Sequence, residues 1–302
     1  MADKPKGIKS FFKKYGVSYF MLSFWLIIFA VFVVVPVISS VALSFTNYDL
    51  LNLPKFTGIK NYTRMFLGDD VFIIALKNTV IFAVITGPLG YIMSFIFAWF
   101  ISDLSNKVRP LYTLLFYAPT LAGNVYFVWI YIFSGDQYGI LNSWLMRLGL
   151  IADPVQWLND PRYNFGVVVI VVLWLSMGAG FLAFVAGFKQ MNRTLFEASA
   201  VDGIRNRWQE LYYVTLPQMG PQLMIGAVLS ISGAFAVGLQ CSMLTGLPST
   251  EYSTHTLLLH MIDTGTYRYE MGYACAIAVV LFALMLVSWA AISRGLSKFS
   301  AD

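Results

Sequence analysis

The sequence predicts an all-α integral membrane protein with six transmembrane helices and both termini in the cytoplasm. Three observations predict this fold class: the apolar composition, the length of the apolar runs and the placement of the basic residues. Of the 302 residues, 58% are hydrophobic and 12% are charged, and the mean hydropathy is +0.70. Soluble domains carry about a quarter charged residues, so the composition excludes a soluble enzyme, a disordered chain and a nucleic-acid-binding protein. Two cysteines exclude a disulfide scaffold.

Six apolar runs are long enough to cross the hydrocarbon layer, which takes about 20 residues of helix. None of their cores contains Asp, Glu, Lys or Arg. Pro36 is expected to kink the first run, and glycine and serine residues interrupt the fifth. We expect the spans at residues 17–45, 78–101, 111–133, 165–188, 224–244 and 271–292.

The basic residues predict the direction of these spans. Thirteen lie in the two terminal tails, the second-to-third connection and the fourth-to-fifth connection, against seven in the remaining connections. Because connections rich in Lys and Arg stay in the cytoplasm, we expect both tails there. The chain then divides into a cytoplasmic tail over residues 1–16, a first span with an outer loop over 17–77, and a core of five spans over 78–302. A polar cytoplasmic insert over 189–221 belongs to this core.

Several kinds of chemistry are missing from the sequence. No Gly-x-x-x-x-Gly-Lys sequence occurs, so the chain is not expected to hydrolyse ATP by a phosphate-binding loop. The histidines are His255 and His260, which lie five residues apart without a neighbouring Cys or acidic cluster, so we expect neither a metal nor another cofactor. Ion-coupled transporters place ionisable groups within their spans, and these span cores have none. The chain is therefore predicted to be a passive gate driven by another subunit.

The polar insert predicts two short helices along the cytoplasmic face of the membrane. Thr194 followed by Glu197 fits a capping box, so a helix is expected to begin there. Gly203 can adopt the left-handed conformation that ends such a helix. A second amphipathic helix carrying Trp208 is expected to run until Pro217 stops it.

The sequence of the insert resembles the signature motif of a known protein family. The run Glu197-Ala198-Ser199-Ala200-Val201-Asp202-Gly203, followed by Leu216-Pro217, is similar to the coupling-loop signature of ABC importer permeases: Glu-Ala-Ala, three residues, Gly and a later Leu-Pro. Ser199 stands where Ala is commoner, and the gap before Leu216 is one residue longer than in the family pattern. Two outer stretches resemble the carbohydrate-uptake branch, the relatives of maltose and glycerol-3-phosphate permeases: Gly58-Ile59-Lys60-Asn61-Tyr62 with Met65-Phe66, and Gly139-Ile140-Leu141-Asn142.

This resemblance implies that the insert docks in a cleft of an ATPase subunit. Glu197 would pair there with a basic group, and Gly203 would allow the tight turn. A purely local interpretation remains open, in which Glu197 only caps its helix and Asp202 is a solvated charge; the two roles can coexist. The ATPase-coupling residues implied by the family pattern are Glu197, Ala198, Ser199, Asp202, Gly203, Leu216 and Pro217.

The resemblance also implies partners and a location. The chain would be a multi-pass permease subunit in the bacterial cell membrane, paired with a second homologous permease subunit and two ATP-binding subunits. An extracytoplasmic solute-binding protein would land on the outer loops. The surplus of basic residues on the cytoplasmic side is expected to attract anionic membrane lipid.

The predicted function is ATP-driven import of a sugar or oligosaccharide, but the sequence assigns no substrate residue. Aromatic residues make up 17% of the chain, so those within the spans are more often packing residues than sugar contacts. Import of another solute, such as a polyol or a glycerol phosphate, stays open. A membrane enzyme or a channel is less well supported, since no set of acidic, His or selectivity residues converges. The polar and aromatic candidates considered are Tyr91, Trp99, Asn124, Trp129 and Trp174.

Overall fold

The computed structural model describes residues 8–123 and 125–297, with side chains described from residue 16 to residue 295 apart from residue 124. This part of the chain is helical, and it contains no β-strand beyond an isolated bridge between Thr46 and Phe56. Much of the predicted tail over residues 1–16 lies outside the described residues, and so do Asn124 and Lys298.

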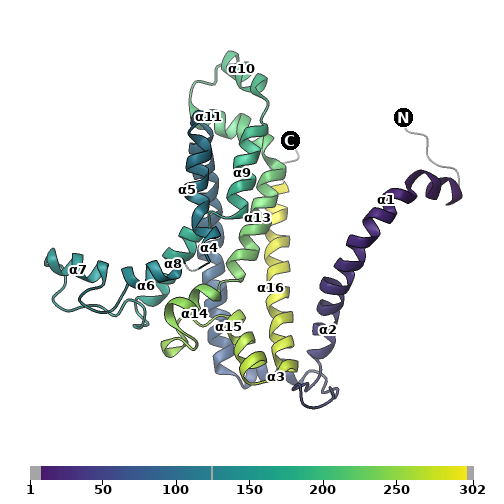
Figure 1. Cartoon of the computed structure of the whole chain (residues 1–302), viewed down its shortest axis with the longest axis vertical. Helices are drawn as coiled ribbons and strands as arrows, with labels where there is room; N and C mark the ends of the chain where they lie inside the picture. The colour runs from purple at the N-terminus through teal and green to yellow at the C-terminus, as the bar shows by residue number, and fades with distance from the viewer. Residues whose placement is uncertain (1–7, 124, 298–302) are drawn as a thin grey trace.

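The first apolar run forms one long helical rod that stands apart from the rest of the molecule (Figure 1). It consists of α1 (Ile8–Phe29), the π-helical turn η1 (Ala30–Val34) and α2 (Val35–Leu43). Pro36 lies in the first turn of α2, directly after the π-helical turn. Only α2 approaches the bundle, where it packs against α16. None of the most apolar part of this rod is buried.

The bundle is built around α4 (Asp70–Ser102), a helix of 33 residues. It begins eight residues before the predicted span, because the side chain of Asp69 accepts a hydrogen bond from the Phe72 N–H and caps the helix there. α4 packs against α8 (Asn164–Leu175), α9 (Ala179–Gln190) and α13 (Gly220–Phe235), and α13 packs in turn against α16 (Met271–Ser297).

Three of the predicted spans are divided. The fourth consists of α8 and α9, which are separated at residues 176–178. The third consists of α5 (Arg109–Leu121) and α6 (Tyr126–Ile132), whose axes differ by 85°. Pro119 lies in the last turn of α5 and Ala122 is extended, so the α5 helix ends early. The fifth consists of α13 and α14 (Leu239–Thr245), and α13 joins the helix before it at an angle of 84°. Four described helices or helix pairs could therefore span a membrane, or six if each strongly bent pair counts as one span.

The two ends of the bundle differ in what they carry. The insert end carries α10 (Arg193–Val201), α11 (Arg207–Glu210), η2 (Leu211–Thr215) and α12 (Leu216–Gln218). The loop end carries α3 (Lys60–Leu67), η3 (Thr250–Tyr252), α15 (Leu257–Ile262) and η4 (Asp263–Tyr267), while α7 (Ile140–Arg147) projects sideways with α6. In Figure 1 the first described turns of α1 and the last turns of α16 both point towards the insert end.

Candidate functional site

The N-cap of the first short helix of the insert lies two residues earlier than the sequence predicts. Asn192 is this N-cap, and the side-chain Oδ1 accepts hydrogen bonds from the Thr194 N–H at 3.1 Å and from the Thr194 hydroxyl at 2.9 Å. The predicted capping box is therefore wrong, because Asn192 already occupies the extended cap position and Thr194 becomes a donor to it. Glu197 is exposed, and its carboxylate has no hydrogen bond or ion pair within the described residues.

The turn after this helix confirms the prediction for Gly203, whose φ is +94°. The Ile204 N–H donates to the Ser199 carbonyl at 3.0 Å, and the Gly203 N–H donates to the Ala200 carbonyl at 3.4 Å. These two bonds make a Schellman motif, which requires a left-handed residue at this position. A Cβ at Gly203 would meet nothing within 4 Å, so the backbone conformation and not space is what favours glycine.

The second short helix ends one residue after Pro217, close to where the sequence predicts, but Pro217 itself lies inside the helix. Helical structure continues from α11 through η2 into α12 and reaches Gln218 before the chain turns into α13. The Leu216 N–H bonds to the Leu211 carbonyl, five residues back. A proline ring collides with the carbonyl four residues before it in a regular α-helix, and the wider π-helical turn removes that collision.

The second half of the insert is fastened to the bundle. Leu211 and Leu216 pack against an apolar cluster at the insert end, together with Met219. Arg207 pairs with Asp103, the residue that follows α4, and its guanidinium lies 5.0 Å from the ring centroid of Trp99. From α4, Phe95, Ala98 and Ile101 are buried in that cluster.

Trp99 therefore lies beside the insert, against the start of α11. It is 7% exposed, and its ring centroid is 5.1 Å from that of Trp208. Asp103 was not among the residues predicted to be functional. The sequence does contain a pattern that could have indicated it: Asp103 follows an apolar run and lies four positions after Trp99, a spacing that places both residues on one helix face.

The seven predicted coupling residues do not form one continuous surface. Glu197, Ala198, Asp202 and Gly203 are exposed at the tip of the insert. Ser199 is buried, with its hydroxyl donating to the Phe196 carbonyl at 2.8 Å. Leu216 is half-buried in the apolar cluster, and Pro217 is exposed beside it. The insert also exposes large apolar and aromatic side chains: Leu195, Val201, Trp208, Tyr212 and Tyr213.

A small polar cavity of about 250 Å³ lies inside the bundle, where α8 gives way to α9. Thr86, Ser176, Ser230 and Gln240 contribute the polar part of its lining. Within the described residues, the buried Oε1 of Gln240 has no hydrogen-bond partner. The cavity is large enough for several water-sized groups and offers hydroxyl and amide groups, without a charged residue in its lining.

The other aromatic candidates lie elsewhere. Tyr91 lines a separate, almost wholly apolar cavity of about 490 Å³ between α4, α13 and α16, and its hydroxyl donates to the Leu223 carbonyl at 3.3 Å. Trp129 and Trp174 pack edge to face with their ring centroids 5.3 Å apart. None of these three rings lines the polar cavity.

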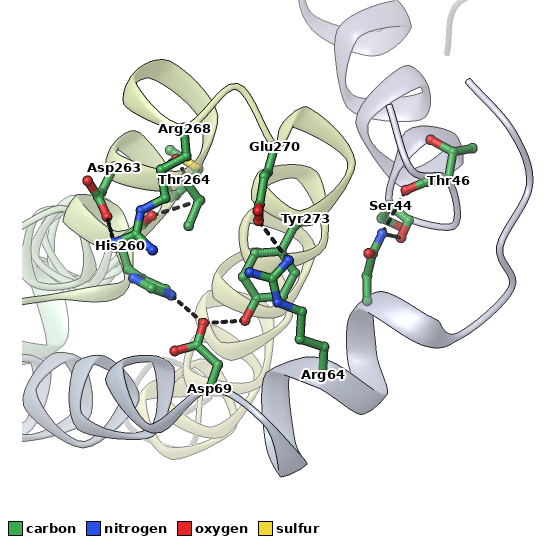
Figure 2. A network of polar contacts seen from close by, with 12 residues as sticks. Ser44, Thr46, Arg64, Asp69, His260, Asp263, Thr264, Arg268, Glu270 and Tyr273 are labelled. Carbon is green, nitrogen blue, oxygen red and sulfur yellow. Dashed lines mark hydrogen bonds and ion pairs between the residues drawn. The ribbon is translucent and has the colours of Figure 1, made fainter. Parts of the chain in front are cut away.

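A polar network holds the loop end together (Figure 2). Asp69 accepts hydrogen bonds from His260 Nε2 at 2.9 Å and from the Tyr273 hydroxyl at 2.6 Å. Burial disfavours the charge of Asp69, but its hydrogen bonds outweigh burial and hold the pKa of the carboxyl below its ordinary value. Arg64 pairs with Glu270 at 2.7 Å and lies over the Tyr273 ring, 4.4 Å from its centroid.

The two histidines come together in this network, a contact that their spacing did not predict. Both are 1% exposed, and their ring centroids are 5.6 Å apart. Among the described residues, neither ring nitrogen of His255 has a hydrogen-bond partner. Burial, with a smaller contribution from His260, lowers the pKa of His255 to about 4. The described residues contain no group of three His, Cys, Asp or Glu that could hold a metal.

Comparison with known proteins matches both the sequence and the fold. Residues 87–294 match the family described as binding-protein-dependent transport system inner membrane component. The chain is 31% identical over 291 residues to the probable ABC transporter permease protein YesP of Bacillus subtilis (strain 168), covering 94% of this chain and 91% of the relative. It is 27% identical over 263 residues to the lactose transport system permease protein LacF of Rhizobium radiobacter, covering 85% and 86%.

The fold is also similar to that of a solved structure. A chain of the bacterial alginate ABC transporter, in complex with an alginate pentasaccharide-bound periplasmic protein, superimposes with a TM-score of 0.75. The two sequences are 23% identical, and the match covers 92% of this chain and 93% of the other.

Proposed function

Because this chain belongs to the family of binding-protein-dependent transport system inner membrane components, we propose that it is a permease subunit of an ATP-driven importer that carries a sugar or oligosaccharide into the cytoplasm. The relatives named for lactose, arabinooligosaccharides and starch degradation products are permease proteins of transport systems. ATP hydrolysis then belongs to a partner subunit, since this sequence lacks a phosphate-binding loop.

The insert end faces the cytoplasm in this proposal, and the loop end faces outward. Two observations support the orientation. The basic residues of the sequence are concentrated in the insert and the connections on its side. The outermost turns of α1 and α16 point the same way as the insert. Six spans, an even number, place both ends of the chain on the same side of the membrane. Residues 17–77 then supply the first span and an outer loop, and residues 78–302 supply the permease core.

The observation that carries the proposal is the exposed tip of α10. Val201 is 86% exposed at the end of the helix, beside the exposed Glu197 and Asp202, and the Gly203 turn fixes the shape of the tip. Single exposed apolar residues are common, but a cluster of them on a short projecting helix fits a cleft in another protein. We assign that cleft to the ATPase subunit.

The polar cavity is the proposed segment of the sugar pathway in this subunit. Sugars present many hydroxyl groups, and the hydroxyl and amide groups of Ser176, Ser230 and Gln240 can exchange hydrogen bonds with them. An uncharged lining favours a neutral sugar or polyol over a glycerol phosphate, which would need a cationic partner. A second homologous permease subunit would complete the pathway, and the uncovered surface of α1 and α2 supports a further membrane partner.

Transport follows from relative motion of these parts. Closure of two ATPase subunits on ATP would draw the inserts of both permease subunits together and open the pathway towards a solute-binding protein seated on the loop end. Hydrolysis would return the inward-open state. The insert must be rigid and firmly seated for this motion to reach the spans.

The test is co-purification of the ATPase with the Val201→Asp variant. Placing a charge on the tip is expected to reduce ATPase retention at least tenfold, because the charge would be buried in the cleft without a partner. Leu53→Asp is the matched control, since Leu53 is also 86% exposed but lies at the loop end. Equal retention in both variants would contradict docking through α10. Ligand screening on the cognate binding protein then separates sugars from other solutes.

A further inference from the structure

The insert and α4 meet through four side chains at the start of α11. Arg207 pairs with Asp103 and its guanidinium lies 5.0 Å from the Trp99 ring centroid, while Trp208 lies 5.1 Å from the same ring. The guanidinium thus has an aromatic face on one side and a carboxylate beside it, an arrangement that fixes its orientation. Arg207 and Asp103 are 104 positions apart in the sequence.

These contacts are not needed to hold the insert on the bundle. The side chains of Arg207 and Asp103 are 54% and 44% exposed, and exposed ion pairs add little stability. Leu211, Leu216 and Met219 already bury apolar surface in the same region. The contacts instead restrict the direction in which α11 can move relative to α4.

A continuous set of contacts leads from this point to the polar cavity. Gly90 lies nine residues before Trp99 on α4, a distance of about 14 Å along one helix. A Cβ at Gly90 would approach the Ser176 Cβ to 2.9 Å, so the two helices touch closely there. Ser94 strengthens that contact by donating its hydroxyl to the Ser176 carbonyl at 3.1 Å. Gly90 and Ser176 both line the cavity.

We propose that Trp99, Asp103, Arg207 and Trp208 form a latch that makes the insert and α4 move as one body, so that displacement of the insert by the ATPase reaches the α4–Ser176 contact at the cavity. The latch rests on the proposed function, since it transmits the motion that the ATPase supplies. Arg207 and Asp103 act as positioning residues and touch no substrate.

The test uses the complete transporter in proteoliposomes, with the ATPase subunits and the loaded binding protein. Arg207→Gln and Asp103→Asn are expected to retain the ATPase on co-purification but to lower the amount of solute transported per ATP about fivefold. The double variant is expected to lose no more than either single variant, because both remove one shared contact. The reversed pair, Asp103→Arg with Arg207→Asp, is expected to recover at least half of the lost coupling.

Arg64→Gln is the matched control. Arg64 has the same kind of contacts at the loop end, an ion pair with Glu270 and a position over the Tyr273 ring, and its side chain is 46% exposed. It is expected to leave transport per ATP unchanged.

Three results would overturn the latch: wild-type coupling in both single variants, no recovery in the reversed pair, or loss of the ATPase from Arg207→Gln, which would make Arg207 part of the docking surface. Failure of the wild-type chain to retain an ATPase on co-purification would refute the proposed function itself. This measurement needs no variant, so the two failures are distinguishable.

Discussion

The insert end and the loop end of this protein use similar contacts in opposite ways. Each end places an arginine over an aromatic ring and beside a carboxylate: Arg207 with Trp99 and Asp103, and Arg64 with Tyr273 and Glu270. At the loop end, further buried polar groups surround this arrangement. At the insert end, the arrangement secures only α11, and α10 extends beyond it.

The loop end is held by bonds between distant parts of the chain. Asn78 donates to the carbonyls of Tyr252 and His255, and Thr79 accepts from the Leu257 N–H at 2.8 Å. The side-chain bonds of α10, in contrast, come from its own neighbours, such as the cap at Asn192. The hydrogen-bonded loop end is therefore a rigid frame. At the insert end, α10 is a short exposed helix that a partner protein can bind.

The largest effect is expected from Asp69→Ala, which removes the centre of the frame. The variant loses the cap of α4 and leaves His260 and Tyr273 without their acceptor. We expect it to lower the free energy of unfolding by about 3 to 4 kcal/mol, measured by denaturant unfolding in detergent. Asp49→Ala is the control, because the Asp49 carboxylate bonds only to Leu51 and Asn52 at the exposed loop. Equal losses would show that Asp69 is not central.

The next effect is a dependence of the frame on pH. The pKa of His255 is about 4 in the folded protein, below its ordinary 6.5, so the unfolded chain binds more protons between these values. Stability is therefore complete above pH 6.5 and falls as the pH drops towards 4, by roughly 2 to 3 kcal/mol. Thermal unfolding across this range measures the loss. The charged or titratable groups that influence His255 are His260, Asp263, Arg268 and Asp69.

A His255→Phe variant sharpens this prediction. The ring nitrogens have no partner within the described residues, so an apolar ring of similar shape is expected to be neutral or stabilising at pH 7. The slope between pH 6.5 and 4 should become much flatter. An unchanged slope would assign the pH dependence to another group.

A smaller effect, confined to the insert, is expected from Gly203→Val. A β-branched residue at a φ of +94° is strained by about 1 to 2 kcal/mol. We expect substrate-stimulated ATPase activity and transport to fall while the frame at the loop end keeps its stability. Gly203→Asn is the control, since Asn visits left-handed conformations more readily. Unchanged transport in Gly203→Val would refute this role of the turn.

The smallest effect compares the two caps within the insert. Asn192→Ala is expected to destabilise α10 by about 1 kcal/mol, seen as faster hydrogen exchange of its amides. Asn206 caps α11 in the same way, accepting from the Trp208 N–H at 3.0 Å. Asn206→Ala should change exchange less, because the contacts of Arg207 and Leu211 also hold α11 in place. The reverse order would contradict the division of the insert into a free half and a fastened half.

Local patterns predicted some details of this fold correctly and others incorrectly. Gly203 was predictable because its requirement is a backbone conformation set by the chain on either side. The cap was misplaced because Asn192 and Thr194 both suit a cap, and only the backbone geometry selects between them. Pro217 was expected to stop a helix, and the helix ends one residue later, at Gln218. No local pattern indicates the π-helical turn that admits the proline ring into the helix.

The protein class, the approximate places of the apolar helices and the turn at Gly203 follow from the sequence alone. Hydropathy, charge placement and glycine conformation each act over a few to about 20 neighbouring residues, so they can be read along the chain. The contact of Asp103 with Arg207 of the insert, the meeting of two histidines beside Asp69, and the polar cavity where α8 gives way to α9 depend instead on the tertiary structure. These contacts join residues up to 191 positions apart, and packing of whole helices, which no local window contains, brings them together.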